Sequence, residues 1–106
     1  MTAKTPTATS GRAKKLRDLE SAAEYFIDRA AEDNSHAIRL DGLDAAVIGT
    51  GNQYTKQTLL IYSARLIIEI FMTRDGMSEE DAIEFFDHNV ACLWAGKGTP
   101  IIVADF

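Results

Sequence analysis

The sequence predicts a single α+β domain with a three-stranded, mainly antiparallel sheet, two helices on one face of the sheet and an additional N-terminal helix. Two observations lead to this fold class. Three segments repeat apolar residues every three or four positions between charged ones, as amphipathic helices do. Three short apolar runs rich in β-formers end at turn residues, as strands do. The composition, 106 residues with 46% hydrophobic and 25% charged, is typical of one globular domain with its own core.

The N-terminal segment changes character near residue 11. Residues 1–10 are rich in Thr, Ala and Ser and show no apolar repeat, so we expect a flexible basic tail. Residues 11–32 predict a long amphipathic helix, because apolar side chains recur with helical spacing at Leu16, Leu19, Ala23, Phe26, Ile27 and Ala30. We expect this helix to belong to one domain over residues 11–106, whose core lies in residues 44–105.

Two strands follow the first helix. Residues 45–50 form a short apolar run with Gly49 and Gly51 at its end, and residues 58–62 form a second run rich in β-formers. The connection between the two runs is too short for a crossover helix. We therefore expect an antiparallel hairpin.

Two helices and a third strand complete the predicted domain. Ser63 precedes a helix over residues 64–75 as its N-cap, and Gly76 would end that helix in a left-handed conformation. Ser78 precedes a helix over 79–95 that ends at Gly96 and has a predicted buried stripe of Ala82, Ile83, Phe86, Val90, Leu93 and Trp94. A turn at Thr99 and Pro100 then leads into a strand over 101–104.

The charge is distributed unevenly along the chain. The net charge is −5, from 11 basic and 16 acidic residues. Residues 1–17 hold five basic residues and no acidic one, so residues 18–106 hold six basic and 16 acidic residues, a net charge of −10. An acidic body repels phosphate backbones, so nucleic acid would be held by the basic N-terminal arm alone. The single cysteine, Cys92, and the lack of a long apolar stretch lead us to expect a cytoplasmic protein with no membrane partner.

A small-molecule site is one functional hypothesis. Two glycine-containing turns resemble fragments of phosphate-binding loops, one after a predicted strand and one around Lys97, although neither completes the motif. If these turns meet at one edge of the sheet, a ligand would contact Gly49, Thr50, Gly51, Tyr62 and Lys97. Turn and helix-cap geometry explains the same glycines without any ligand.

The acidic helix over residues 79–95 is a second candidate surface. The residues that we expect to contact a protein partner are Glu80, Asp81, Glu84, Asp87 and His88. The same carboxylates would suit a DNA mimic, and those in the first turn also stabilise the helix dipole without any partner. His88 and Cys92 are four residues apart and would share a helix face, but no second cysteine or clustered histidine completes a site. We therefore predict no metal, no cofactor and no catalytic residue.

An ordered series of motifs runs from Asp44 to Val103. It consists of Ala46-Val47-Ile48-Gly49, Leu60-Ile61-Tyr62, Arg74-Asp75-Gly76-Met77-Ser78-Glu79-Glu80-Asp81-Ala82, Asn89-Val90, Trp94-Ala95-Gly96 and Thr99-Pro100. In these motifs the chain resembles a small family of uncharacterised proteins of bacteriophages, prophages and some bacterial genomes. Members of that family carry an acidic, aromatic segment ending in Lys-Cys where this chain has Ser63-Ala64-Arg65-Leu66. The resemblance implies a viral or mobile-element origin and supports the fold, and it implies no reaction.

Together these features predict a small non-enzymatic accessory protein of a phage or prophage that binds a host protein, for example as an inhibitor of host defence. The alternatives are a module that sequesters a small molecule such as a nucleotide signal, and an acidic DNA mimic. We also expect a homodimer. The reason is that one N-terminal helix cannot cover both faces onto which the strand side chains would alternate, namely Ile48, Leu60, Tyr62, Ile101 and Val103.

Overall fold

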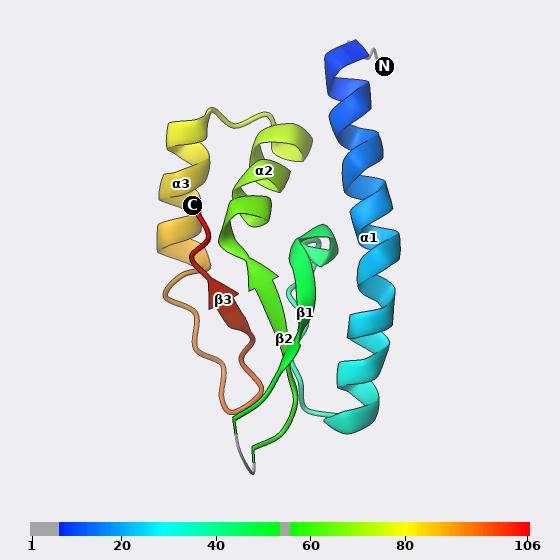
Figure 1. The fold of residues 1–106 in the computed structure, drawn as a ribbon. Helices are drawn as coiled ribbons and strands as arrows, with labels where there is room; N and C mark the ends of the chain where they lie inside the picture. The colour runs from blue at the N-terminus through cyan, green and yellow to red at the C-terminus, as the bar shows by residue number, and fades with distance from the viewer. Residues whose placement is uncertain (1–6, 54–55) are drawn as a thin grey trace.

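The described part of the chain folds into three α-helices, a short 3₁₀ helix and a three-stranded sheet, an α+β fold as the sequence predicts (Figure 1). The computed structural model describes residues 7–53 and 56–106. Its elements in chain order are α1 (Thr7–Asp33), the short 3₁₀ helix η1 (Asp44–Ala46), β1 (Val47–Gly51), β2 (Leu59–Ser63), α2 (Ala64–Asp75), α3 (Glu79–Asn89) and β3 (Ile101–Val103). Within these ranges, every helix is either too short or too polar to cross a lipid bilayer.

The sheet is mixed and has the strand order β1-β2-β3. β1 and β2 form the expected antiparallel hairpin, with Val47 opposite Tyr62 and Gly51 opposite Leu59. β3 pairs with β2 in parallel, with Ile101 opposite Ile61. The parallel pairing has a simple cause, because β2 leads directly into α2 and the chain returns to the sheet only after two helices.

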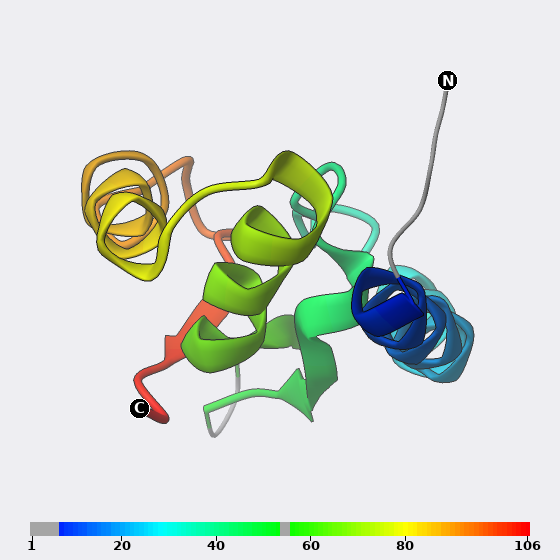
Figure 2. The same cartoon turned by 90° about the horizontal axis from the view of Figure 1, so that it is seen from above.

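The helices cover one side of the sheet. Seen from above, α1, α2 and α3 lie side by side with α2 in the middle, and the strands run along one side of this row (Figure 2). α2 packs on β2 and on α3, whereas α1 packs on η1 and β1. Between the layers lies a core that includes Ala23, Ala30, Leu60, Tyr62, Ile67, Phe71, Ala82 and Phe86.

The expected helix caps are present. The Leu66 backbone N–H donates to the Ser63 hydroxyl at 3.1 Å, and the Asp81 N–H donates to the Ser78 hydroxyl at 3.2 Å. Gly76 ends α2 with φ of 72°, in the left-handed region that glycine adopts without strain. Local sequence signals therefore define both ends of α2 and the start of α3.

The first helix begins earlier than predicted. α1 starts at Thr7, so the last four residues of the expected flexible tail are helical, and residues 1–6 lie outside the described part of the chain. Gly11 does not interrupt the helix, because extending an existing helix by one residue adds one hydrogen bond at little cost compared with nucleation.

The third helix ends six residues before the predicted end, at Asn89 instead of residue 95. The Val90 and Ala91 backbone N–H groups both donate to the Phe86 carbonyl at 2.9 Å, which closes the last turn and directs the chain away from the helix axis. The predicted buried stripe is therefore wrong at its end, where the side chain of Trp94 is 76% exposed and that of Leu93 is 38% exposed. It is also wrong at Ile83, which is 37% exposed, whereas Ala82, Phe86 and Val90 are buried as predicted.

Candidate functional site

Within residues 7–53 and 56–106, no helix covers one face of the sheet, and we call this face the open sheet face (Figure 2). Side chains alternate along β2, so Leu60 and Tyr62 are buried under the helices while their neighbours lie on the other side. Ile48 is 45% exposed, Ile101 39% and Val103 37%. The open sheet face consists of Ile48, Gly49, Gly51, Leu59, Ile61, Ile101 and Val103.

Two glycines shape the open sheet face. At Gly51, an added Cβ would lie 2.9 Å from the Cδ1 atom of Ile61, so the missing side chain makes room for that isoleucine. At Gly49, an added Cβ would meet nothing within 4 Å, so β1 offers a flat strip of backbone there. Register shifts beside Ile48, at an irregularity in the β1–β2 pairing. These glycines shape an apolar surface and do not form a phosphate-binding loop.

A cleft lies at the end of the open sheet face, between the β1–β2 hairpin and the segment that follows α3. We call it the Trp94 cleft. Its volume is about 750 Å³, and it is lined by Asn52, Gln53, Lys56, Gln57, Leu59, Trp94, Lys97, Thr99 and Ile101. Leu59 and Ile101 belong to both surfaces, so the cleft and the open sheet face are continuous.

The segment that carries Trp94 and Lys97 is held in place by hydrogen bonds. The Ala95 N–H donates to the Thr99 hydroxyl at 2.8 Å, and that hydroxyl donates to the Gly96 carbonyl at 2.7 Å. The Ile38 N–H donates to the Gly98 carbonyl at 2.9 Å. A Cβ on Gly98 would lie 1.9 Å from the His36 carbonyl oxygen, so only glycine allows this close approach of two backbones.

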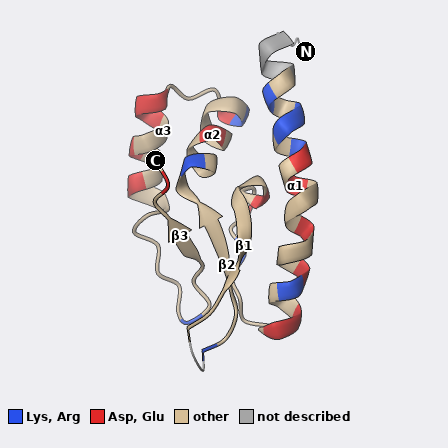
Figure 3. Cartoon of the chain, viewed as in Figure 1, with Lys and Arg blue, Asp and Glu red and all other residues tan. Residues whose placement is uncertain are grey.

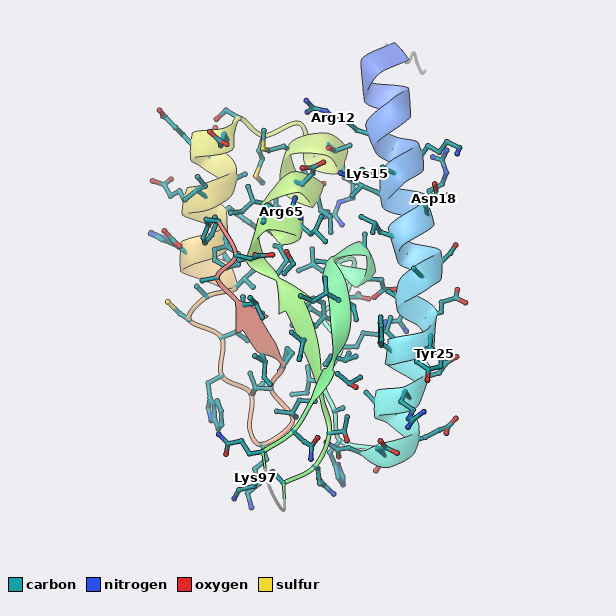
Figure 4. All side chains as sticks on the ribbon, viewed as in Figure 1. Arg12, Lys15, Asp18, Tyr25, Arg65 and Lys97 are labelled. Carbon is teal, nitrogen blue, oxygen red and sulfur yellow. The ribbon has the colours of Figure 1, made fainter. Side chains whose placement is uncertain are left out.

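The charge of the Trp94 cleft differs from that of the rest of the domain. Lys56 and Lys97 line it, no carboxylate does so among the described residues, and neither lysine is in an ion pair within them. Figure 4 shows Lys97 beside the hairpin, at the opposite end of the molecule from Arg12. The acidic residues lie mainly along α1 and α3, and the strands carry none (Figure 3). The cleft is therefore a locally cationic site on an acidic domain.

The structure does not bring the five predicted ligand residues together. Lys97 lines the Trp94 cleft, whereas Gly49 and Gly51 lie on the open sheet face. Thr50 pairs with Leu60 and so shares the face covered by helices. Tyr62 has no exposed surface, its hydroxyl accepts the Leu40 N–H at 2.7 Å, and burial raises its pKa. Tyr62 therefore supports the core, and its expected contact with a ligand is wrong.

The acidic helix does present a recessed surface. Asp81, Glu84 and His88 line a shallow hollow of about 320 Å³ together with Met77, Phe85 and Asn89. Glu80 and Asp87 are exposed on the same helix. Phe85 is 43% exposed and contacts Phe71 edge to face, with ring centroids 5.0 Å apart. α3 thus combines carboxylates with a partly exposed aromatic ring.

His88 and Cys92 do not form a pair on one helix face, because α3 ends between them. The Cys92 thiol is exposed and donates to the Asp87 carbonyl at 3.2 Å. Among the described residues, no three His, Cys, Asp or Glu side chains cluster closely enough to hold a metal ion.

Sequence reasoning missed one contact at the end of the chain, the cap that Asp105 provides to α2. Its carboxylate accepts the Ser63 hydroxyl at 2.5 Å and the Arg65 N–H at 2.9 Å. Partial burial opposes ionisation of this carboxyl group, but the hydrogen bonds from Ser63, Arg65 and its own backbone, together with the charge of Arg65, outweigh the effect of burial and lower the pKa of Asp105. Because the capping carboxylate lies 42 residues from Ser63, no local sequence signal could have found it.

Comparisons with models of protein families, with curated proteins and with solved structures found no match to this chain.

Proposed function

We propose that this protein is a non-enzymatic binding module that forms a two-fold homodimer through its open sheet face and binds a host protein through α3. The observation that carries the proposal is the exposure of aliphatic side chains on the two outer strands of the open sheet face, with Ile48 on β1 and Ile101 and Val103 on β3, on either side of the half-buried Leu59 and Ile61 of β2. A contiguous apolar surface of this kind is typical of protein interaction sites.

A second copy of this chain is the occupant that suits the open sheet face. The strands carry no charged residue, so two such faces can approach each other without burying an unpaired charge. The acidic residues lie mainly on α1 and α3, away from this surface (Figure 3). Gly49 leaves β1 flat, which favours the close face-to-face packing seen between two sheets. Closed two-fold pairs are also the commonest soluble assembly.

α3 is the surface that we propose for the host protein. The predicted partner residues Glu80, Asp81, Glu84, Asp87 and His88 lie along this helix, and three of them share the hollow with Phe85. A partner that fits would present basic side chains beside an apolar one, because the carboxylates of Asp81 and Glu84 line the same hollow as the partly exposed Phe85. We assign this partner to a host cell because the chain resembles phage and prophage proteins. An acidic DNA mimic would use the same helix and stays an alternative.

The assembly is tested by light scattering and sedimentation at micromolar concentration. The natural chain should have twice its monomer mass of 11.7 kDa. The double variant Ile48→Lys with Val103→Lys should be a folded monomer, because two charges would be buried at the interface. Ile83→Lys is the matched control, since Ile83 is exposed to 37%, as Val103 is, but lies on α3. A natural chain that is monomeric at this concentration refutes the dimer.

The host contact is tested separately by cross-linking in host lysate. A protein retained by the natural chain should also be retained by Ile48→Lys with Val103→Lys, and should be lost from Asp81→Lys with Glu84→Lys. Glu24→Lys with Asp28→Lys is the control for a general effect of charge, because it makes the same charge change at two exposed carboxylates of α1 instead of α3. Equal retention by the α3 variant would assign the contact to another surface.

A further inference from the structure

We propose that the Trp94 cleft is a binding site for a small anionic ligand with a flat ring, of the nucleotide class. The ring and the charges of this site come from Trp94, Lys56 and Lys97, which belong neither to the open sheet face nor to α3, and the site shares only Leu59 and Ile101 with the open sheet face.

The size and the walls of the cleft suit such a ligand. Its volume of about 750 Å³ falls within the usual range for small-molecule sites, about 300–1,000 Å³. Leu59 and Ile101 form an aliphatic part of the lining, and the Trp94 side chain, 76% exposed, supplies a ring for stacking. Tryptophan side chains are buried on average, so an indole this exposed is unusual. Exposed aromatic rings are common where they bind a partner.

The polar groups of the cleft indicate the charge of the ligand. Lys56 from the hairpin and Lys97 from the loop after α3 are both free of ion pairs among the described residues. Three carboxamide side chains, Asn52, Gln53 and Gln57, offer donors and acceptors to the edge of a ring. A phosphate between the lysines and a base on the indole would satisfy both kinds of group.

The charge of the whole domain restricts the ligand to a small one. Residues 18–106 carry a net charge of −10, which repels a long phosphate backbone more strongly than a single nucleotide. The lysines of the cleft attract phosphate only over a short range, because salt screens charges beyond about 8 Å.

One wall of the cleft, the loop after α3, is held in place before a ligand arrives. Gly98 holds the loop against His36 and Ile38, and the Thr99 hydroxyl closes the turn next to Lys97. A loop fixed in this way loses little conformational entropy on binding, which favours affinity.

Fluorescence of the chain reports directly on this site, because Trp94 is its single tryptophan. The probes are adenosine, guanosine, cytidine and uridine triphosphates, a cyclic dinucleotide, adenosine alone and inorganic tripolyphosphate. At least one nucleotide should quench the fluorescence saturably. Adenosine alone should bind at least about tenfold more weakly than its triphosphate, which corresponds to about 1.4 kcal/mol or more from the phosphates. Tripolyphosphate should compete without quenching, because it occupies the lysines but has no ring to stack on Trp94.

Variants locate the site. Lys97→Gln and Lys56→Gln should each weaken binding about five- to tenfold, while Lys15→Gln, on exposed α1, should leave it unchanged. Trp94→Leu should weaken binding about tenfold or more when measured by equilibrium dialysis. Circular dichroism confirms that each variant is folded.

Three results would overturn the proposal. The first is the absence of saturable quenching by every nucleotide at millimolar concentration. The second is equal binding by the natural chain and the two lysine variants. The third is tighter binding of a ten-residue single-stranded oligonucleotide with a steep salt dependence, which would assign the cleft to nucleic acid instead of a free nucleotide. None of these results would refute the proposed dimer or the proposed α3 contact, which are tested by the experiments described above.

Discussion

Replacing Phe86 by alanine tests how α3 packs against the rest of the fold. The Phe86 side chain is 4% exposed and lies in the core under α2. Removing a buried phenylalanine side chain costs the transfer free energy of the ring and leaves a cavity, which together amount to about 3–5 kcal/mol. Phe106 contacts Phe86 edge to face at 6.2 Å, but it is 73% exposed and can turn only partly into the space. We therefore expect Phe86→Ala to lower the free energy of unfolding by about 3–5 kcal/mol.

The neighbouring residue provides a matched control. Phe85 is 43% exposed, and its main contact is the edge-to-face pair with Phe71. Phe85→Ala removes less buried surface and leaves no closed cavity, so we expect a loss of about 1 kcal/mol. The two variants have the same composition and differ only in which helix face loses the ring.

Urea unfolding followed by circular dichroism measures both losses. Trp94 fluorescence is a poor reporter of the core, because its side chain is 76% exposed. A domain of this size has a free energy of unfolding of about 5–15 kcal/mol, so Phe86→Ala should lower the midpoint strongly or unfold the chain. Equal midpoints for the two variants, or a larger loss for Phe85→Ala, would refute the assignment of Phe86 to the buried face of α3 and of Phe85 to the exposed face.

Three further substitutions test other contacts. Gly76→Val should lower the free energy of unfolding by about 1–3 kcal/mol, because a β-branched residue is strained at φ of 72°; an unchanged melting temperature would contradict the left-handed cap. Gly98→Ala should destabilise the loop after α3, because its Cβ would lie 1.9 Å from the His36 carbonyl oxygen, and faster hydrogen exchange of the Ile38 N–H would report it. Asp105→Asn should lower the free energy of unfolding by about 1 kcal/mol at neutral pH, an amount reduced by solvent screening. The folded pKa of Asp105 lies below the ordinary value of 3.8, so the stabilisation that its carboxylate provides is present above pH 3.8 and is lost as the pH falls through the folded pKa. The natural chain and Asp105→Asn should therefore converge in stability at low pH. A difference in stability that stays constant with pH would contradict the capping role of the Asp105 carboxylate.

Local signals in the sequence were sufficient for most of the fold. Ser63, Gly76 and Ser78 define the ends of α2 and the start of α3, because capping depends only on neighbouring backbone groups. The short connection after Gly51 was sufficient to predict the hairpin. The parallel pairing of β3 was not evident, because it depends on where the chain returns after two helices and not on any local pattern.

The candidate site was less accessible to sequence reasoning. Trp94 continued the apolar spacing of α3, so the sequence predicted a buried position, but Asn89 ends that helix and the indole is exposed. Tyr62 had the character of a ligand-binding residue, yet the alternation along β2 places it under the helices with Leu40 as its hydrogen-bond partner. The end of α3 thus decides that Trp94 is exposed, and the face of β2 on which Tyr62 lies decides that Tyr62 is buried.

The exposed apolar surface is a sheet face and not a strand edge, and this difference decides whether it favours a closed pair or an open-ended assembly. An uncovered strand edge adds further strands by hydrogen bonding and promotes open-ended aggregation. Here β1 lies beside α1, and the other outer strand, β3, has only three residues (Figure 1). The aliphatic side chains project from a face, where they can pack against one partner but cannot extend a ladder. With a net charge of −5 on each chain, additional copies repel one another once the faces are covered. The proposed homodimer would therefore be a closed pair and not the start of a fibre.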